Sequence, residues 1–533
     1  MTETRIQTMA RWATHLELDD VPEQVLELCR AQRRSVIAAM AASQGAASPE
    51  RVLRATLANA GAGPTPTPGS AERVRTEDAL IAASALSIAL DYDDYLLFGH
   101  TGHSAVLVPL LMSAETGASG QAQLLAQLVA NEVEARLGAA CVIGPLNGQL
   151  WSFIHAGGAA LAAGRLLALS ESQMAHALAI SLYQAPRPTP PGFMAPDSKL
   201  LTAADPTLVG LRAARMAAHG VTGPLDVLDH PSGFLSAFTF QALPSMLGGL
   251  GDGWATRTLC IKPYPGCAYI DTTVDALLSL GWIDPVEVSR IDVVAGAMTC
   301  GMDGMSKDYA RDRPTPVTVN FSIPWNVAIV VLTGRLTPAE VNEDWLLEHE
   351  SELRRIVERV ELKHGWELSR RTLEALTPVL SPRAMFEDLG ARRMLSGLGE
   401  LRREHGHVEF SARDLVDALL YLPRAGAAAR SYRPFGEQAL ERFQMTFPAH
   451  VRVTLRSGRV LEAEANVPRG GAGCAEYDPI AASHDKLRDN ATPLWGEEST
   501  RALAAAIDTD DDDLVQRLAD CWAASAGSSS LAS

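Results

Sequence analysis

The sequence predicts a mainly α fold in which an all-helical bundle domain is joined to a second, α+β domain. Three observations support this prediction. Helical periodicity and Ala-rich apolar stretches fill the first half of the chain, a glycine-rich break falls at residues 248–253, and short segments typical of strands follow it. A chain of 533 residues is also longer than one compact core usually holds. We therefore expect two domains.

Helices are expected in the first half wherever apolar residues recur on one face. Asp20 and Pro22 mark the start of one helix, and Gly220 marks the end of another. The tail from about Ser499 is helical in the same way. Residues 510–513 are interpreted as the solvated start of its last helix, since the glycine and spaced glutamate of a calcium loop are missing. The other predicted segments are 76–90, 105–112, 121–137, 156–169, 172–181 and 206–218.

Strand patterns appear after the glycine-rich break. Apolar and polar residues alternate over 451–455, and Ser457 with Gly458 supplies a hairpin turn before a partner strand at 460–467. Further strands are expected at 291–294 and 316–321, with helices at 337–350 and 411–422. The second half is therefore predicted to be α+β.

Composition excludes several classes of function. The net charge of -17 repels phosphate backbones and anionic lipid, so neither nucleic acid nor membrane is expected as a partner. The longest apolar runs are shorter than the roughly 20 residues that span a bilayer, and residues 1–18 lack the apolar core of a signal peptide. Seven scattered cysteines without C-x-x-C spacing are typical of reduced thiols. We expect a cytoplasmic location.

An acidic cluster is the first candidate for chemistry. Asp91 and two further aspartates at 93 and 94 follow a buried-looking helix, with Tyr95, His100 and His103 shortly after them. Three adjoining carboxylates cannot all ionise cheaply in a dry site, so at least one pKa should be raised or the charge offset by cations. A solvated loop at a helix end explains the same pattern equally well. A third ligand for a metal is missing.

Two proline-rich segments carry lysines. Five prolines lie between residues 186 and 196, ahead of Lys199, so a rigid connector between helices would hold this lysine in place, although a surface connection is the simpler interpretation. Lys262, Tyr264 and Cys267 lie in a K-P-Y-P-G-C segment whose X-Pro steps favour extended backbone. Clefts between domains are common ligand sites, but a structural linker remains the alternative. Cys267 is more typical of a packed residue than of a nucleophile.

These residues resemble the MmgE/PrpD superfamily, which includes 2-methylcitrate dehydratase, cis-aconitate decarboxylase and iminodisuccinate epimerase. The resemblance implies a helical domain at 1–258, completed by 470–533, and an α+β lid domain at 259–469. It further implies a homodimer without cofactors that acts on a small carboxylated substrate. A helical insertion at about 365–440 departs from it. The stretches that carry the resemblance are 89–94, 104–115, 132–138, 163–183, 199–218 with 223–228, 258–277, 317–336 and the hairpin at 449–469.

The resemblance also implies the site residues. Asp91, Lys199 and Lys262 match the family's aspartate and two lysines, and His103 or His100 matches its first histidine. The family's second histidine is replaced by Gln149, with His155 nearby in another register, and Cys267 and Asp271 stand where relatives have histidines. The predicted substrate-binding residues are Tyr95, Gln149, Tyr264, Cys267 and His155.

The predicted activity is that of a lyase, either a dehydratase or a decarboxylase. Lys199 and Lys262 would bind substrate carboxylates and stabilise enolate-like charge, and a histidine, His103 before His100, would transfer the proton next to a carboxylate. Asp91 would orient that histidine or take a proton itself. Two alternatives remain open: an isomerase, epimerase or cyclase-type proton-transfer enzyme that loses no group, and a catalytically silent homologue.

Overall fold

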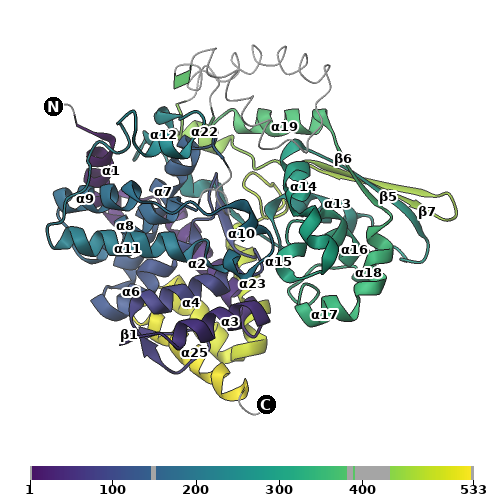
Figure 1. Ribbon diagram of the computed structural model, residues 1–533, viewed down its shortest axis with the longest axis horizontal. Helices are drawn as coiled ribbons and strands as arrows, with labels where there is room; N and C mark the ends of the chain where they lie inside the picture. Colours follow the sequence, from purple (N-terminus) through teal and green to yellow (C-terminus); the bar gives the residue numbers. More distant parts are fainter. Residues whose placement is uncertain (1–2, 146–151, 381–387, 390–432, 530–533) are drawn as a thin grey trace.

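The computed structural model describes residues 3–145, 152–380, 388–389 and 433–529 (Figure 1). A helical body occupies one side of the molecule, and a smaller part built on a mixed sheet occupies the other. The predicted mainly α fold with an α+β second region is confirmed. None of the described helices is long and apolar enough to cross a membrane. The domain boundaries remain a prediction.

The helical body is built from both ends of the chain. Its N-terminal helices are α1 (Arg5–His15), α2 (Glu23–Ser43), α3 (Ala47–Leu57), α4 (Thr76–Ile88), α5 (Gly102–Ala105), α6 (Leu107–Thr116), α7 (Gly120–Ala140), α8 (Ile154–Leu166), α9 (Glu171–Tyr183), α10 (Pro190–Met194), α11 (Ala204–Ala218) and α12 (Phe234–Phe238). The C-terminal helices α23 (Pro479–Trp495), α24 (Glu497–Asp508) and α25 (Leu514–Ser529) return to this body, where α23 packs along α2.

Small residues let the central helices approach one another closely. Helix α8 packs against α7 and α11, and its Ala-rich face is fully buried. A Cβ atom at Gly210 on α11 would clash with the main-chain oxygen of Ala156 on α8. Such contact lets dispersion between tightly packed atoms stabilise the body even though few large side chains lie at this interface.

The α+β region surrounds a four-stranded sheet of order β6-β5-β7-β8. Strand β5 (Val288–Ala295) runs parallel to β6 (Val360–His364) and antiparallel to β7 (Ala449–Leu455), which forms the predicted hairpin with β8 (Val460–Ala465). The described helices of this region are α13 (Asp271–Ser279), α14 (Ala297–Asp312), α15 (Pro316–Val319), α16 (Ile323–Thr333), α17 (Glu343–Glu348), α18 (Glu350–Val357) and α19 (Trp366–Leu376). Helix α22 (Glu437–Glu441) lies beside α12 of the helical body (Figure 1).

Two predicted elements differ in the structure. Residues 316–321, expected as a strand, begin with helix α15, because Thr315 caps the helix through a bond from the Thr318 N–H and Pro316 suits its first turn. In place of the helix expected at 337–350, the structure has α17, which begins where the Asn342 side chain accepts a bond from the Asp344 N–H, and the first residue of α18. The helix predicted at 411–422 lies outside the described residues.

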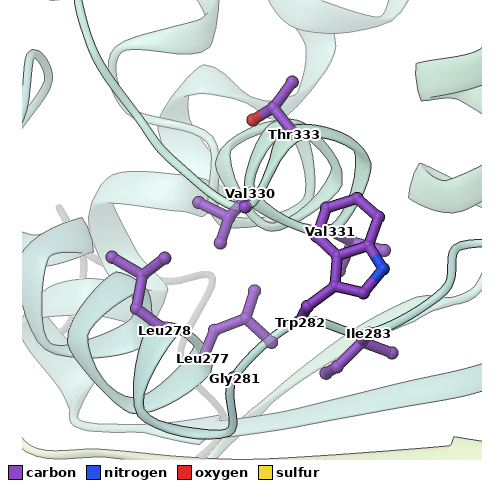
Figure 2. A pocket seen from close by; sticks show the side chains of 9 residues that line it. Leu277, Leu278, Gly281, Trp282, Ile283, Val330, Val331 and Thr333 are labelled. Atoms are coloured by element: carbon purple, nitrogen blue, oxygen red, sulfur yellow. The ribbon is translucent and has the colours of Figure 1, made fainter.

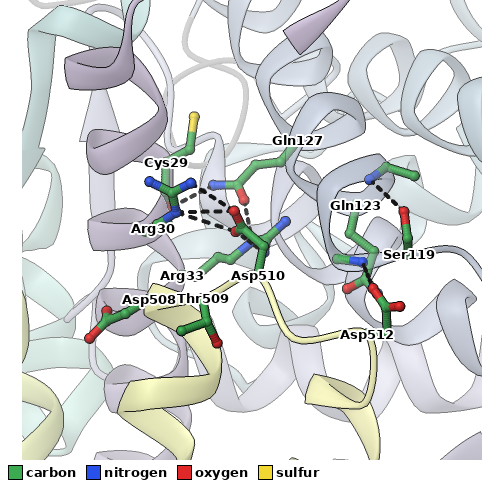
Figure 3. A network of polar contacts seen from close by, with 12 residues as sticks. Cys29, Arg30, Arg33, Ser119, Gln123, Gln127, Asp508, Thr509, Asp510 and Asp512 are labelled. Carbon is green, nitrogen blue, oxygen red and sulfur yellow. Dashed lines mark hydrogen bonds and ion pairs between the residues drawn. The ribbon is translucent and has the colours of Figure 1, made fainter.

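The acidic stretch at 510–513 also departs from its prediction. It precedes α25 as expected, but Asp510 is not solvated: its carboxylate accepts bonds from Arg30, the closest at 2.7 Å, and lies 3.6 Å from Arg33 (Figure 3). Asp512 accepts a bond from the Gly120 N–H at 2.7 Å. The stretch therefore fixes the C-terminal helices to α2 and α7.

A hollow of about 280 Å³ opens between the ends of α13 and α16 (Figure 2). Its lining is mostly apolar and includes Leu277, Trp282 and Val331. No predicted site residue lines it, so it is separate from the candidate active site.

Candidate active site

The acid turn, defined here as residues 91–94, follows α4 and leads into strand β3 (Asp94–Leu96). Asp91 has a φ of 48°, a left-handed conformation that is uncommon outside glycine and that neighbouring contacts must hold. Strand β3 pairs antiparallel with β4 (Leu259–Ile261), and Asp94 lies opposite Ile261. This pairing brings the acid turn beside Lys262, although the two segments are far apart in the sequence.

Asp93 is at the centre of the charge network. Its Oδ1 accepts a hydrogen bond from Lys262 Nζ at 2.8 Å, and its Oδ2 lies 2.6 Å from His100 Nδ1 and 3.1 Å from His103 Nε2. Lys262 Nζ also donates to the main-chain oxygen of Asp91 at 2.6 Å. All of these side chains are buried. One carboxylate thus contacts a lysine and two histidines, a role for which the sequence favoured Asp91.

Asp91 pairs with the other predicted lysine. Lys199, in the short helix η2 (Asp197–Leu201), donates from Nζ to Asp91 Oδ2 at 2.9 Å and is fully buried. Its Nζ lies 4.9 Å from the centre of the Phe321 ring and 5.8 Å from that of Phe193. Aromatic faces stabilise a buried cation without neutralising it. The structure therefore brings Asp91, Lys199, Lys262 and both histidines into one buried site.

Proton affinities within this site diverge. Burial raises the pKa of Asp94 to about 6, and the adjoining Asp93 carboxylate contributes. Burial would raise the pKa of Asp93 as well, but Lys262 and His100 hold it well below its usual value. Burial lowers the pKa of His100, which keeps its imidazole neutral near pH 7. Both outcomes expected for adjoining carboxylates, a raised pKa and an offsetting cation, occur here.

His155 lies next to His103, with their ring centres 5.9 Å apart in an edge-on arrangement. Ser104 Oγ is 2.7 Å from His155 Nδ1 and 2.6 Å from Glu134 Oε1. Burial lowers the pKa of His155 and raises that of Glu134, so both side chains favour their neutral forms. A neutral polar cluster therefore supports the charged centre from the side of α7 and α8. The Glu134 carboxyl fits because α8 has Gly158 at the point of contact.

The predicted tyrosines take different positions. Tyr95 is buried in β3, opposite Cys260, and its ring centre lies 6.0 Å from that of His100. Tyr264 is buried too, but its hydroxyl donates to Asp275 Oδ1 at 2.8 Å. The structure thus places Tyr95 against a site histidine and Tyr264 against helix α13.

Cys267 and Gln149 complete the predicted set. The main-chain N–H of Cys267 donates to the Asn320 oxygen at 2.8 Å. Burial, assisted by Asp91, raises the pKa of its thiol to about 12, so Cys267 stays protonated at neutral pH, as expected for a packed residue. Gln149 lies outside the described residues.

Sequence reasoning missed Lys486, Ser104 and Glu134. Lys486 Nζ donates to the main-chain oxygens of Tyr92, at 2.6 Å, and of Lys262, at 3.2 Å. The only available signal was a lysine inside an otherwise amphipathic helix near the C-terminus, which is normally a surface pattern. In the part of the chain that the structure describes, no group of three or more His, Cys, Asp or Glu side chains could hold a metal ion.

Together these features define a mainly helical protein with a buried Asp-His-Lys centre. Residues 7–245 match the MmgE/PrpD N-terminal domain, in agreement with the resemblance found in the sequence. Two cis-aconitate decarboxylases, one from Aspergillus terreus and one from its strain NIH 2624 / FGSC A1156, are each 26% identical over 393 residues. The match covers 68% of this chain and 76% of each relative. Family and relatives support a lyase of the dehydratase or decarboxylase type.

Proposed function

We propose that the protein is a lyase that uses no cofactor and acts on a small carboxylated substrate by proton transfer at a carbon next to a carboxylate. The observation that carries the proposal is the contact of Asp93 with Lys262, His100 and His103 in a buried site that also holds Lys199. Proton transfer requires a group that titrates near neutral pH, and enolate-like charge requires fixed cations.

The lysines supply the cations. Among the described residues, Lys199 donates a hydrogen bond to Asp91 alone, so two of its three N–H groups are available for a substrate carboxylate. Lys262 donates to Asp93 and to the Asp91 main chain. Burial would lower the pKa of Lys262, but Asp93 and Asp91 raise it above its usual value, so the cation persists at any pH of interest. A dry site strengthens the attraction of both lysines for developing negative charge.

We assign the proton transfer to His100. Its Nδ1 lies 2.6 Å from the Asp93 carboxylate, which holds that nitrogen as N–H and leaves the basic lone pair on Nε2. Burial lowers the pKa of His100, so the imidazole is neutral before it takes up a proton. In His103 the Asp93 carboxylate contacts Nε2 instead, and Nδ1 lies 2.7 Å from Ser87 Oγ. This order reverses the sequence-based preference for His103. The neutral His100 would accept the proton, and Asp93 would stabilise the resulting imidazolium.

Incubation with cis-aconitate and a panel of other small di- and tricarboxylates in deuterium oxide tests the reaction class. Cis-aconitate comes first because it is what the named relatives act on. Proton NMR should show loss of water or carbon dioxide from one member of the panel. Deuterium incorporation with an unchanged carbon skeleton would favour the isomerase or epimerase instead. No change in any acid, with the protein folded, would favour a silent homologue.

Replacing His100 tests the proton carrier. We expect His100→Ala to reduce kcat by roughly 10²–10⁴-fold, because general acid–base groups contribute that much. The matched control is His219→Ala, which removes an exposed histidine at the end of α11. Equal kcat values for His100→Ala and the control would rule out this role.

A further inference from the structure

Lys486 is a buried cation far along the chain from the acid turn. It lies on α23, and its side chain reaches the main chain of Tyr92, which is 394 residues away in sequence. Its Nζ donates to Tyr92 O at 2.6 Å, to Ser35 Oγ at 3.1 Å and to Lys262 O at 3.2 Å. The Tyr92 ring centre is 3.8 Å from the same atom. Three segments of the chain therefore meet at one ammonium group.

The acceptors of these hydrogen bonds include the main-chain oxygens of both segments that build the site. Tyr92 lies between Asp91 and Asp93, and Lys262 supplies the cation that contacts both of those residues. Asp91 has the left-handed φ of 48°, a conformation that persists only where surrounding contacts over-determine it. Lys486 connects the carbonyl that follows this strained residue to the main chain of Lys262. None of its three hydrogen bonds is to a charged side chain.

We propose that protonated Lys486 is a positioning residue, which holds the acid turn and Lys262 in register for the reaction. The three acceptors use all three N–H groups of the ammonium form. A neutral amine has two N–H groups and no positive charge, so deprotonation weakens the bonds to the two main-chain oxygens, even where the Ser35 hydroxyl then donates to the amine. The relative position of the acid turn and Lys262 thus depends on the charge state of a residue that is proposed to act without touching the substrate.

The surroundings of Lys486 make that charge state sensitive to pH. The charged groups that face it are Asp93 and Asp94 from the acid turn, Lys262 after β4 and Asp271 at the start of α13. Burial lowers the pKa of Lys486 to about 7, although the aspartates oppose this shift. The group therefore titrates near neutral pH, where a surface lysine would stay charged.

The inference rests on the proposed function only for its kinetic consequences, and kinetics supply the first test. Lys486→Met should reduce kcat by roughly 10²-fold, since small misplacements of reacting groups have effects of that size. The wild-type rate should fall as pH rises through about 7. Lys486→Arg keeps its charge throughout, so its rate should exceed that of Lys486→Met, and the fall in rate should move to higher pH than in the wild type. The exposed Arg488→Met on the same helix is the control. A merely structural role would leave the pH profile of both Lys486 variants unchanged, which would overturn the proposal.

Crystal structures of the variants test the inference even if no substrate is found. In Lys486→Met, Lys262 Nζ should move out of hydrogen-bond distance from Asp93, and Asp91 should leave its left-handed conformation. In Lys486→Arg both features should be retained. An unchanged acid turn in Lys486→Met would refute the positioning role, whatever reaction the protein catalyses.

If Lys486→Met does not fold, two comparisons with the wild type remain. The pH profile of Lys486→Arg gives the first, and a structure of the wild-type protein at about pH 9 gives the second. The proposal expects Lys262 to shift from Asp93 in the alkaline wild-type structure and to stay in place in Lys486→Arg at that pH. No shift in the wild type would overturn it.

Discussion

Two buried ionic clusters in the described part of the protein differ in their chemistry. The first is the acid turn with its lysines and histidines. The second, here called the arginine cluster, joins Arg30 and Arg33 of α2 to Asp510 and Gln127 (Figure 3). Both connect segments that are distant in the sequence, and both are nearly free of solvent contact. They differ in the groups that supply positive charge.

Because of that difference, we expect the arginine cluster to contribute to stability and the acid turn to contribute to catalysis. Arginine holds its proton at any pH the protein meets: burial lowers the pKa of Arg33 only to about 10. The acid turn combines aspartates with histidines and lysines, whose affinities for protons can be brought close to neutrality by burial and neighbouring charge. A neutral chain of amides joins the two clusters. Gln127 donates to Gln32 at 2.8 Å, and Gln32 donates to Asp94 at 2.7 Å.

The largest expected effect comes from removing the cation at Asp93. Lys262→Met should reduce kcat/KM by roughly 10³-fold, because it removes a fixed donor from developing negative charge and leaves Asp93 without its lysine. Steady-state kinetics at pH 7 on the substrate found in the NMR panel would measure it. Lys363→Met, at a half-exposed lysine of β6, is the control. A loss below tenfold would show that the acid turn is a structural cluster like the other one.

The arginine cluster should behave in the opposite way. Arg30→Met leaves the buried Asp510 carboxylate short of its closest partner, and breaking a buried pair typically lowers the free energy of unfolding by about 3–5 kcal/mol. The kcat of the folded enzyme should stay within twofold of the wild type. Urea unfolding and kinetics on the same sample measure both quantities. The control Arg501→Met removes an exposed arginine of α24 and should change stability by less than about 0.5 kcal/mol. A large fall in kcat for Arg30→Met would mean that the amide chain transmits catalytic effects.

The sequence predicted the helical body well because its evidence is local. Apolar periodicity located α4, α7, α8, α9 and α11 to within a few residues, and alternation located the β7–β8 hairpin. Residues 316–321 were misjudged because Val317 and Val319 resemble a strand, whereas the cap at Thr315 and the proline after it decide for a helix.

The candidate site was predicted in composition but not in geometry. Asp91, His100, His103, Lys199 and Lys262 do meet, yet the central role of Asp93 depends on the pairing of β3 with β4. Each of these strands has three residues, too few for any periodic signal. Lys486 was missed for a related reason: nothing local distinguishes a buried lysine from a solvated one when its acceptors are main-chain oxygens from other segments.

The smallest expected effect is a pH dependence of the free energy of unfolding that comes from Asp94 and that the arginine cluster lacks. Burial and the Asp93 charge raise the folded-state pKa of Asp94 to about 6 from 3.8. A carboxyl group with a raised pKa contributes stability below its unfolded-state pKa, and this contribution is lost as pH rises through the folded-state pKa. The free energy of unfolding of the wild type relative to Asp94→Asn should therefore fall by at most about 3 kcal/mol between pH 4 and pH 6.5. Urea unfolding across that range measures it, with the exposed Asp485→Asn as the control. Because arginine does not titrate there, the difference between Arg30→Met and the Arg30→Met/Asp94→Asn double variant should follow the same curve. Parallel curves of unfolding free energy against pH for the wild type and Asp94→Asn would mean that Asp94 is ionised over the whole range, so that its folded-state pKa is not raised.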